Sequence, residues 1–87
     1  VEAYLDLGQT YQERRQYDRA VQVYQKAIQI APQDVRLYQQ AGIALKESKD
    51  YQGAEEMIRQ AAKLAPQNVR IQRLLGSLVA LNLVSKE

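Results

Sequence analysis

Small and apolar residues recur along the chain at the spacing of an α-helix. Positions 4, 7, 8 and 11, and then 20, 24, 27 and 28, each fall on one side of a 3.6-residue helix. Pro32 and Pro66 disfavour helical geometry in the residue before them, so each marks a boundary. Asp34 and Asn68 follow at positions suited to capping the next helix. The pattern predicts five helices, over residues 2–14, 18–31, 35–48, 52–65 and 69–82.

The same pattern returns at a fixed interval along the chain. Residues 1–34 laid over 35–68 without a gap give ten identities, including a glycine at 8 and 42 and a proline at 32 and 66. A third copy opens at Val69, places Gly76 one further interval on, and stops about halfway through the repeat. The sequence therefore predicts a repeat architecture, in which stacked copies bury one another's apolar faces.

The repeat resembles the tetratricopeptide repeat (TPR), whose 34-residue unit carries an aromatic residue, Leu-Gly, Tyr, Ala, an aromatic residue, Ala and Pro. The first copy matches with Tyr4, Leu7, Gly8, Tyr11, Ala20, Tyr24, Ala27 and Pro32. The second copy keeps Tyr38, Gly42, Ala54, Ala61 and Pro66, and the partial copy keeps Leu75 and Gly76. The resemblance implies an all-α fold, a right-handed superhelix of antiparallel helix pairs. It covers one domain over 1–87, with repeats at 1–34 and 35–68 and a half repeat or capping helix at 69–87.

Glycine at one position in all three copies needs a physical reason, because it costs about 1 kcal/mol inside a helix relative to alanine. We expect two helix backbones to approach closely there, which leaves no room for a Cβ. The alanines at 20, 27, 54 and 61 would serve the same packing from the second helix of each pair.

The composition excludes most catalytic chemistry. The chain has no cysteine and no histidine, so it lacks a thiolate nucleophile and the commonest proton carrier at neutral pH. It also has no glycine-rich phosphate loop and no EF-hand spacing. We expect no enzymatic activity, no cofactor and no metal site. A span of about 20 apolar residues and a signal segment are also absent, which favours a cytoplasmic protein without membrane insertion.

The surface remains as the candidate site. In the resembled family, the first helix of each repeat lines a concave groove that binds peptides, which implies a protein-interaction module acting as a scaffold or adaptor. Steps of three and four residues place one row per first helix on that face. The rows are Glu2, Leu5, Gln9, Gln12 and Glu13; Arg36, Gln39, Ile43, Lys46 and Glu47; and Arg70, Arg73, Ser77, Ala80 and Leu81. Net charge runs from −1 through +1 to +2 over the three copies.

Two other binding modes are disfavoured. Chaperone-binding members of the family hold a terminal carboxylate with lysine, asparagine, asparagine, lysine and arginine. The matching positions here are Leu5, Gln9, Gln40, Arg70 and Leu74, of which only Arg70 keeps the charge. We therefore do not expect a carboxylate clamp. A related 35-residue helical repeat reads single-stranded RNA, but the net charge of +2 and the acidic first row argue against a nucleic-acid partner.

The last predicted helix is apolar on more than one face. One face should pack on the second helix of the second copy, and the other has no partner within residues 1–87. Such a stripe marks an interaction surface or a cut through a larger protein. Because Val1 stands at the opening of a repeat, we expect a fragment of a longer solenoid. The alternative is a structural module that forms a homodimer through this helix. The candidate contacts are Leu74, Leu78, Val79 and Leu81.

Overall fold

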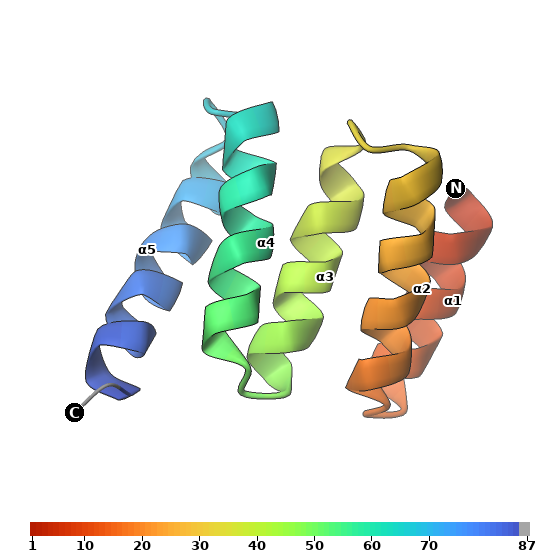
Figure 1. Ribbon diagram of the computed structural model, residues 1–87, viewed down its shortest axis with the longest axis horizontal. Helices are drawn as coiled ribbons and strands as arrows, with labels where there is room; N and C mark the ends of the chain where they lie inside the picture. The colour runs from red at the N-terminus through yellow and green to blue at the C-terminus, as the bar shows by residue number, and fades with distance from the viewer. Residues whose placement is uncertain (86–87) are drawn as a thin grey trace.

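The computed structural model describes residues 1–85, which form five α-helices joined by short turns (Figure 1). They are α1 (Glu2–Glu13), α2 (Tyr17–Ile30), α3 (Val35–Glu47), α4 (Tyr51–Leu64) and α5 (Val69–Ser85). No strand occurs among these residues. The prediction of an all-α solenoid of five helices is confirmed, and only the end of α5 differs from its predicted range by more than one residue. Residues 86 and 87 of the predicted half repeat lie outside the described part.

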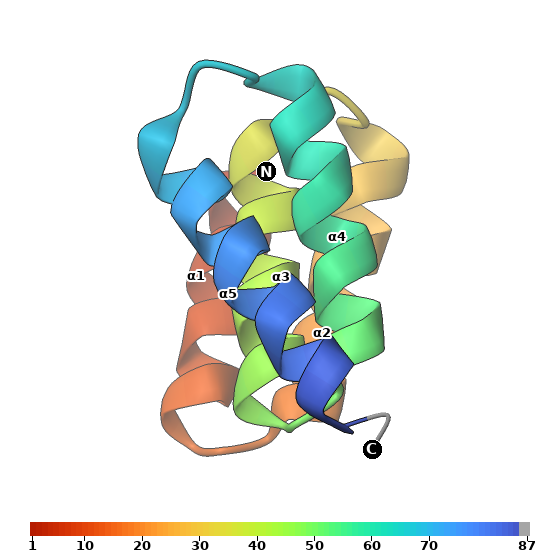
Figure 2. The same ribbon diagram turned by 90° about the vertical axis from the view of Figure 1, so that its left-hand side faces the viewer.

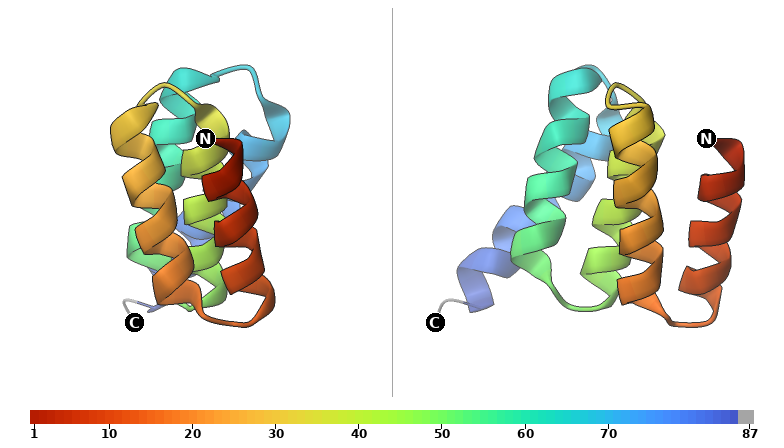
Figure 3. Two further views of the ribbon diagram at one scale, coloured as in Figure 1. Left: turned by 90° about the vertical axis from the view of Figure 1, so that its right-hand side faces the viewer. Right: turned by 45° about the vertical axis from the view of Figure 1, so that its right-hand side comes forward.

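The helices form two layers. α1, α3 and α5 lie in one layer, and α2 and α4 lie in the other (Figures 2 and 3). The extensive contacts join helices that are neighbours in sequence, from α1 with α2 to α4 with α5. This arrangement is what a repeat protein requires, because each unit stabilises only the next. It also places the first helices of successive repeats side by side on one face.

Short polar residues cap the amino ends of α3, α4 and α5. The Asp34 carboxylate accepts a hydrogen bond from the backbone N–H of Arg36 at 3.1 Å, and Asn68 Oδ1 accepts from the N–H of Ile71 at 3.2 Å. Both predicted N-caps are confirmed. Asp50, which the sequence analysis did not single out, caps α4 in the same way.

The turns inside the first two repeats share one backbone device. Arg15 and Lys49, which occupy equivalent positions in the two copies, adopt positive φ angles of 61° and 71°. This left-handed conformation reverses the chain after α1 and α3. Glycine adopts it without steric cost, whereas a residue with a Cβ adopts it only at a steric cost. The repeat therefore preserves a backbone conformation even where it does not preserve the residue type.

Two of the repeated glycines lie under large side chains. An ideal Cβ on Gly8 would lie 2.3 Å from Cε1 of Tyr24, and one on Gly42 would lie 2.5 Å from Cδ1 of Ile58. The expectation of close packing is correct, but its cause differs from the predicted one. The space is filled mainly by a buried side chain of the second helix and not by its backbone. The alanines at 20, 27, 54 and 61 are fully buried beside these contacts.

The predicted contact stripe on α5 is wrong in part. Leu78 is fully buried among residues of α4, so it belongs to the core and is unavailable to a partner. Leu74 and Leu81 pack against the same cluster, and Val79 is half-buried. Leu74, Leu78 and Leu81 face α4 because they lie on the side of α5 that packs against that helix. The large apolar residues of α5 that do lie exposed are Val69, Leu83 and Val84.

Candidate functional site

The predicted rows lie on the layer formed by α1, α3 and α5. Most of their side chains are exposed, and Gln12, Gln39, Ile43, Lys46 and Leu81 are half-buried. Leu5 is the exception, because it is only 6% exposed and belongs to the core cluster that includes Tyr24. The prediction that Leu5 lines a binding surface is therefore wrong. Its place in the row reflects helical spacing alone, and spacing does not say which side chains turn inward.

An ion pair joins α1 to α3 near their amino ends. One guanidinium nitrogen of Arg36 lies 2.6 Å from Glu2 Oε1, and another lies 2.8 Å from Asp34 Oδ2. The hydrogen bond from Arg36 holds the pKa of the Asp34 carboxyl below its ordinary value. Exposed pairs of this kind contribute little to stability, because water screens them. Their main consequence is that the charges of Glu2 and Arg36 neutralise each other at this end of the face.

A second polar connection joins the two helices near their carboxyl ends. Gln12 Nε2 donates to Glu47 Oε1 at 3.0 Å, and Gln12 Oε1 accepts a hydrogen bond from the Tyr24 hydroxyl. Tyr24 is fully buried. Burial and then the charge of Glu47 raise its pKa to about 12. The tyrosine is therefore protonated at neutral pH, and its hydroxyl holds Gln12 in place by donating a hydrogen bond to it. A buried side chain of α2 thus positions a side chain on the surface of α1.

Sequence reasoning placed Gln12 and Glu47 on this face but used Tyr24 only as an aromatic position of the repeat pattern. A signal for the additional role was present, since the second copy carries Ile58 at the equivalent position. Isoleucine fills the same space and cannot donate a hydrogen bond. The polar connection from the core to the surface is therefore specific to the first repeat.

A shallow pocket lies between the two helices at this point. Its volume is about 300 Å³, and it is lined by Gln9, Gln12, Glu13, Gln40 and Glu47. We call it the α1–α3 pocket. Its three carboxamides can each donate and accept hydrogen bonds, and its two carboxylates favour a cationic group. Gln40 was considered only as a clamp position and was absent from the predicted rows. Chemically, this set of groups can bind a polar chain but supplies no activated nucleophile.

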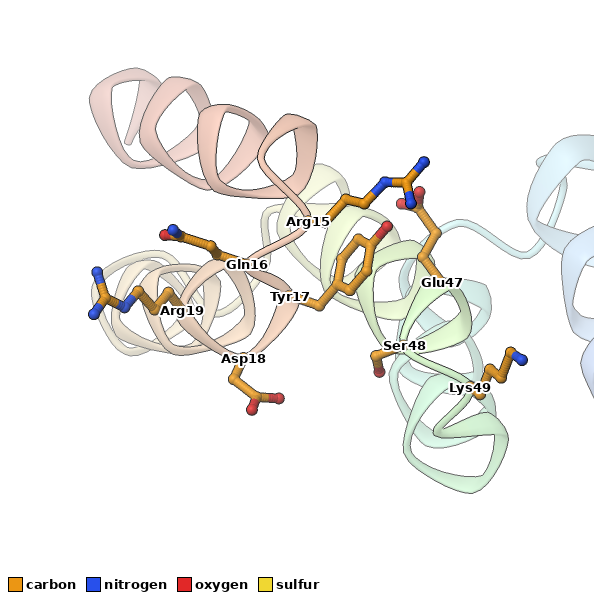
Figure 4. A pocket seen from close by; sticks show the side chains of 8 residues that line it. All are labelled: Arg15, Gln16, Tyr17, Asp18, Arg19, Glu47, Ser48 and Lys49. Carbon is orange, nitrogen blue, oxygen red and sulfur yellow. The ribbon is translucent and has the colours of Figure 1, made fainter.

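Glu47 also lines a neighbouring pocket between the turns that follow α1 and α3. This pocket has a volume of about 620 Å³. Figure 4 shows Arg15 and the Tyr17 hydroxyl pointing toward Glu47, whereas Asp18 and Arg19 point elsewhere. The remaining lining residues are Gln16, Ser48 and Lys49. Glu47 therefore stands between an amide-rich pocket and a pocket with several cationic side chains.

At the other end of the face, Arg70, Arg73 and Ser77 lie exposed on α5. The surface thus changes from amide-rich and acidic between α1 and α3 to basic on α5. Among residues 1–85, no group of three or more acidic side chains is placed to hold a metal ion. Within the same range, no helix combines the length and apolar character of a membrane span.

Comparison with known proteins agrees with this geometry. MamA (residues 41 to the end) from Desulfovibrio magneticus RS-1 superimposes with a TM-score of 0.81 at 25% identity, over 88% of this chain and 44% of that one. A MamA RS-1 double mutant, ArsTM, gives a TM-score of 0.81 and 25% identity over 88% and 43% of the two chains. The chain thus spans less than half the length of these structures. No curated protein matches the sequence significantly.

A family model supplies the assignment. The model described as tetratricopeptide repeat matches residues 11–78, which is most of the chain. The match runs from the end of α1 into α5. It therefore includes both turns with positive φ and the complete second repeat. Together with the two-layered stack of helix pairs, this identifies the chain as a member of the tetratricopeptide repeat family, a helical-repeat module for protein interaction.

Proposed function

We propose that this chain binds a protein segment on the face formed by α1, α3 and α5, and that it acts as a scaffold or adaptor without a covalent step. The observation that carries the proposal is the α1–α3 pocket. Two successive repeats contribute its side chains, and the hydrogen bond from Gln12 to Glu47 holds them in register. A partner that lies across the repeats meets both sets of groups at once.

The pocket is arranged before a partner arrives. Gln12 is held at both ends of its amide, by the Tyr24 hydroxyl and by Glu47. Ordering a free glutamine at an interface costs about 0.5–1.5 kcal/mol, and a side chain that is already ordered avoids much of this cost. The carboxamides of Gln9 and Gln40 can pair with the peptide groups of an extended segment. A basic side chain of that segment suits the carboxylates of Glu13 and Glu47.

A selected peptide tests the proposal without knowledge of the natural partner. Peptides are selected from a random library on the wild-type protein, and their affinities are measured by calorimetry. The groove variant carries Gln9→Ala, Gln39→Ala and Lys46→Ala. Its matched control carries Gln22→Ala, Gln29→Ala and Lys26→Ala, which alter the same residue types at exposed positions of α2 in the other layer.

We expect the groove variant to lose at least about tenfold in affinity, or about 1.4 kcal/mol, and the control to bind as the wild type does. Amide chemical shifts should change on α1 and α3 when peptide is added. Selected peptides that bind the groove variant unchanged, or that perturb only α2 and α4, would contradict the proposal.

A further inference from the structure

A groove with an apolar floor lies in the layer formed by α2 and α4. It runs between these two helices, where α3 is visible behind them (Figure 1). Its volume is about 440 Å³, and binding sites for small groups commonly have about 300–1,000 Å³. Ile28 of α2, Tyr38 of α3 and Met57 of α4 line it as half-buried side chains. The rest of its lining is polar and exposed, and consists of Gln25, Gln29, Glu56 and Gln60. We call this surface the α2–α4 groove.

The floor of the groove is held by the fold. The Tyr38 hydroxyl donates a hydrogen bond to the carbonyl of Pro32 at 2.7 Å, and Ile28 and Met57 pack against the core cluster that includes Tyr24. The unbranched thioether of Met57 can still adapt to the shape of a bound group. Because repeats stack side by side along the chain, a further repeat would lie beyond α1 or α5 and would not cover this floor.

The polar residues of the groove differ in charge from their equivalents in the other copy. Each glutamine corresponds to a basic residue 34 positions away, Gln25 to Arg59, Gln29 to Lys63 and Gln60 to Lys26. None of these basic residues lines the groove.

Glu56 alone is charged among the described residues that line the groove. It forms no ion pair with another residue of the range 1–85. An unpaired carboxylate beside an apolar surface attracts a cationic group. The charge of the groove therefore favours a partner that brings a basic side chain next to an apolar one.

The three glutamines indicate the backbone form of that partner. They stand on both sides of the floor, and each carboxamide can donate and accept hydrogen bonds. An extended segment offers unpaired peptide N–H and C=O groups, whereas a helix has already paired its own. In an extended segment, residues two positions apart point to the same side. A basic residue two positions from an apolar one can therefore reach Glu56 while the apolar side chain enters the groove.

We infer that the α2–α4 groove binds an extended segment of a partner protein, which inserts one large apolar side chain over Met57 and places a lysine or arginine beside Glu56. An apolar centre within a polar rim is the usual anatomy of a protein interface. This surface lies on the layer opposite the α1–α3 pocket, so it is additional to the site proposed above and either one can fail without the other.

Met57 provides a reporter inside the groove. It is the only methionine of the sequence, so isotope labelling of methionine methyl groups gives one nuclear magnetic resonance signal from this site. The probe is the peptide acetyl-Gly-Lys-Ser-Leu-Ser-Lys-Gly-amide, titrated into the complete chain. A lysine on each side of the leucine allows either chain direction. One control peptide carries alanine in place of the leucine, and another carries glutamate in place of both lysines.

A charge exchange tests the position of the basic side chain. Glu56→Lys reverses the charge of the groove, and its matched control is Asp6→Lys, which changes the net charge equally at an exposed position of α1. Both positions are exposed, so circular dichroism should show that both variants stay folded. The peptide series on the wild-type chain tests the apolar contact independently of these variants.

We expect a saturable shift of the Met57 signal with the lysine peptide, and binding at least about fivefold weaker for the alanine peptide. Glu56→Lys should weaken binding of the lysine peptide about two- to fivefold, and it should bind the glutamate peptide more tightly than the wild type does. Asp6→Lys should change neither affinity.

The inference is overturned if the Met57 signal does not move up to about 10 mM peptide. Equal binding of the alanine peptide, or a glutamate peptide that gains nothing from Glu56→Lys, also overturns it. So does sedimentation of the protein alone as a dimer that Glu56→Lys dissociates, since the occupant is then a second copy. Amide shifts confined to α1 and α3 would place the peptide in the α1–α3 pocket, which overturns this inference and leaves the proposed function standing.

Discussion

The same substitution at equivalent repeat positions should have opposite effects on stability. Gly8→Ala places a Cβ 2.3 Å from Cε1 and 2.4 Å from Cζ of Tyr24. Carbon atoms in contact prefer separations of about 3.5–4.0 Å, so either the ring or helix α1 must move by about 1 Å. The ring is fully buried and its hydroxyl is bonded to Gln12, which leaves no free direction for this movement. At Gly76, by contrast, the new methyl group meets no atom within 4 Å apart from its chain neighbours and the backbone of its own helix.

The two contributions can be compared in magnitude. Overpacking a filled core costs about 1–3 kcal/mol, whereas alanine in place of glycine stabilises a helix interior by about 1 kcal/mol. Gly8→Ala should therefore lower the free energy of unfolding by about 1–2 kcal/mol, and Gly76→Ala should raise it by about 1 kcal/mol. The two variants should differ by roughly 10–20 °C in Tm, given about 4–8 °C per kcal/mol for a domain of this size.

Urea unfolding followed by circular dichroism measures both free energies under the same conditions. Gly42→Ala is an internal comparison, because its Cβ would meet the end of the Ile58 side chain at 2.5 Å. Combining Gly42→Ala with Ile58→Val should recover part of its loss, since the shorter side chain leaves room for the methyl group. The reasoning would be refuted if Gly8→Ala were as stable as wild type, or if Gly76→Ala destabilised the protein as much as Gly8→Ala does.

Three further predictions concern the first two repeats. The pKa of Tyr24 is raised from 10.0 to about 12, so native Tyr24 keeps a proton that the unfolded chain loses between these pH values. The free energy of unfolding should therefore fall as the pH rises from 10 to 12. Urea titrations across this range should show a shallower fall for Tyr24→Phe. Asp50→Ala removes the side-chain cap of α4 and should cost about 1 kcal/mol in thermal unfolding, a loss that Asp50→Ser should largely avoid. Arg15→Gly and Lys49→Gly relieve the positive φ angles and should each stabilise the protein by about 0.5–1 kcal/mol in denaturant titrations; a loss of similar size would contradict the steric argument.

The local signals in the sequence located the elements well. Proline at 32 and 66, with Asp34 and Asn68 behind them, set the starts of α3 and α5, because these residues act through their own backbone geometry and hydrogen bonds. The end of α5 was predicted three residues early. The third copy does not reverse direction where the first two do. There Asn82 anchors the last helical turn of α5 to α4 through the carbonyl of Tyr51, a residue distant in sequence.

The candidate face was predicted less completely than the fold. Helical spacing grouped Gln9, Gln12 and Glu13 on one side of α1, but it also grouped Leu5 with them, which the structure buries. Spacing fixes the angle of a side chain around its own helix and carries no information on where the neighbouring helix lies. For the same reason, Gln40 was absent from the predicted rows although it lines the α1–α3 pocket.

The sequence by itself determined the repeat period, the helices and the family, because these depend on residue types at fixed intervals within each copy. The tertiary structure decided which surfaces are available. It placed Tyr24 beneath Gln12, moved Leu78 into the core and left Gly76 uncovered. These outcomes depend on which helix lies against which. Within residues 1–85, identical repeat positions therefore have different surroundings, because Gly8 and Gly42 lie under a second helix and Gly76 does not.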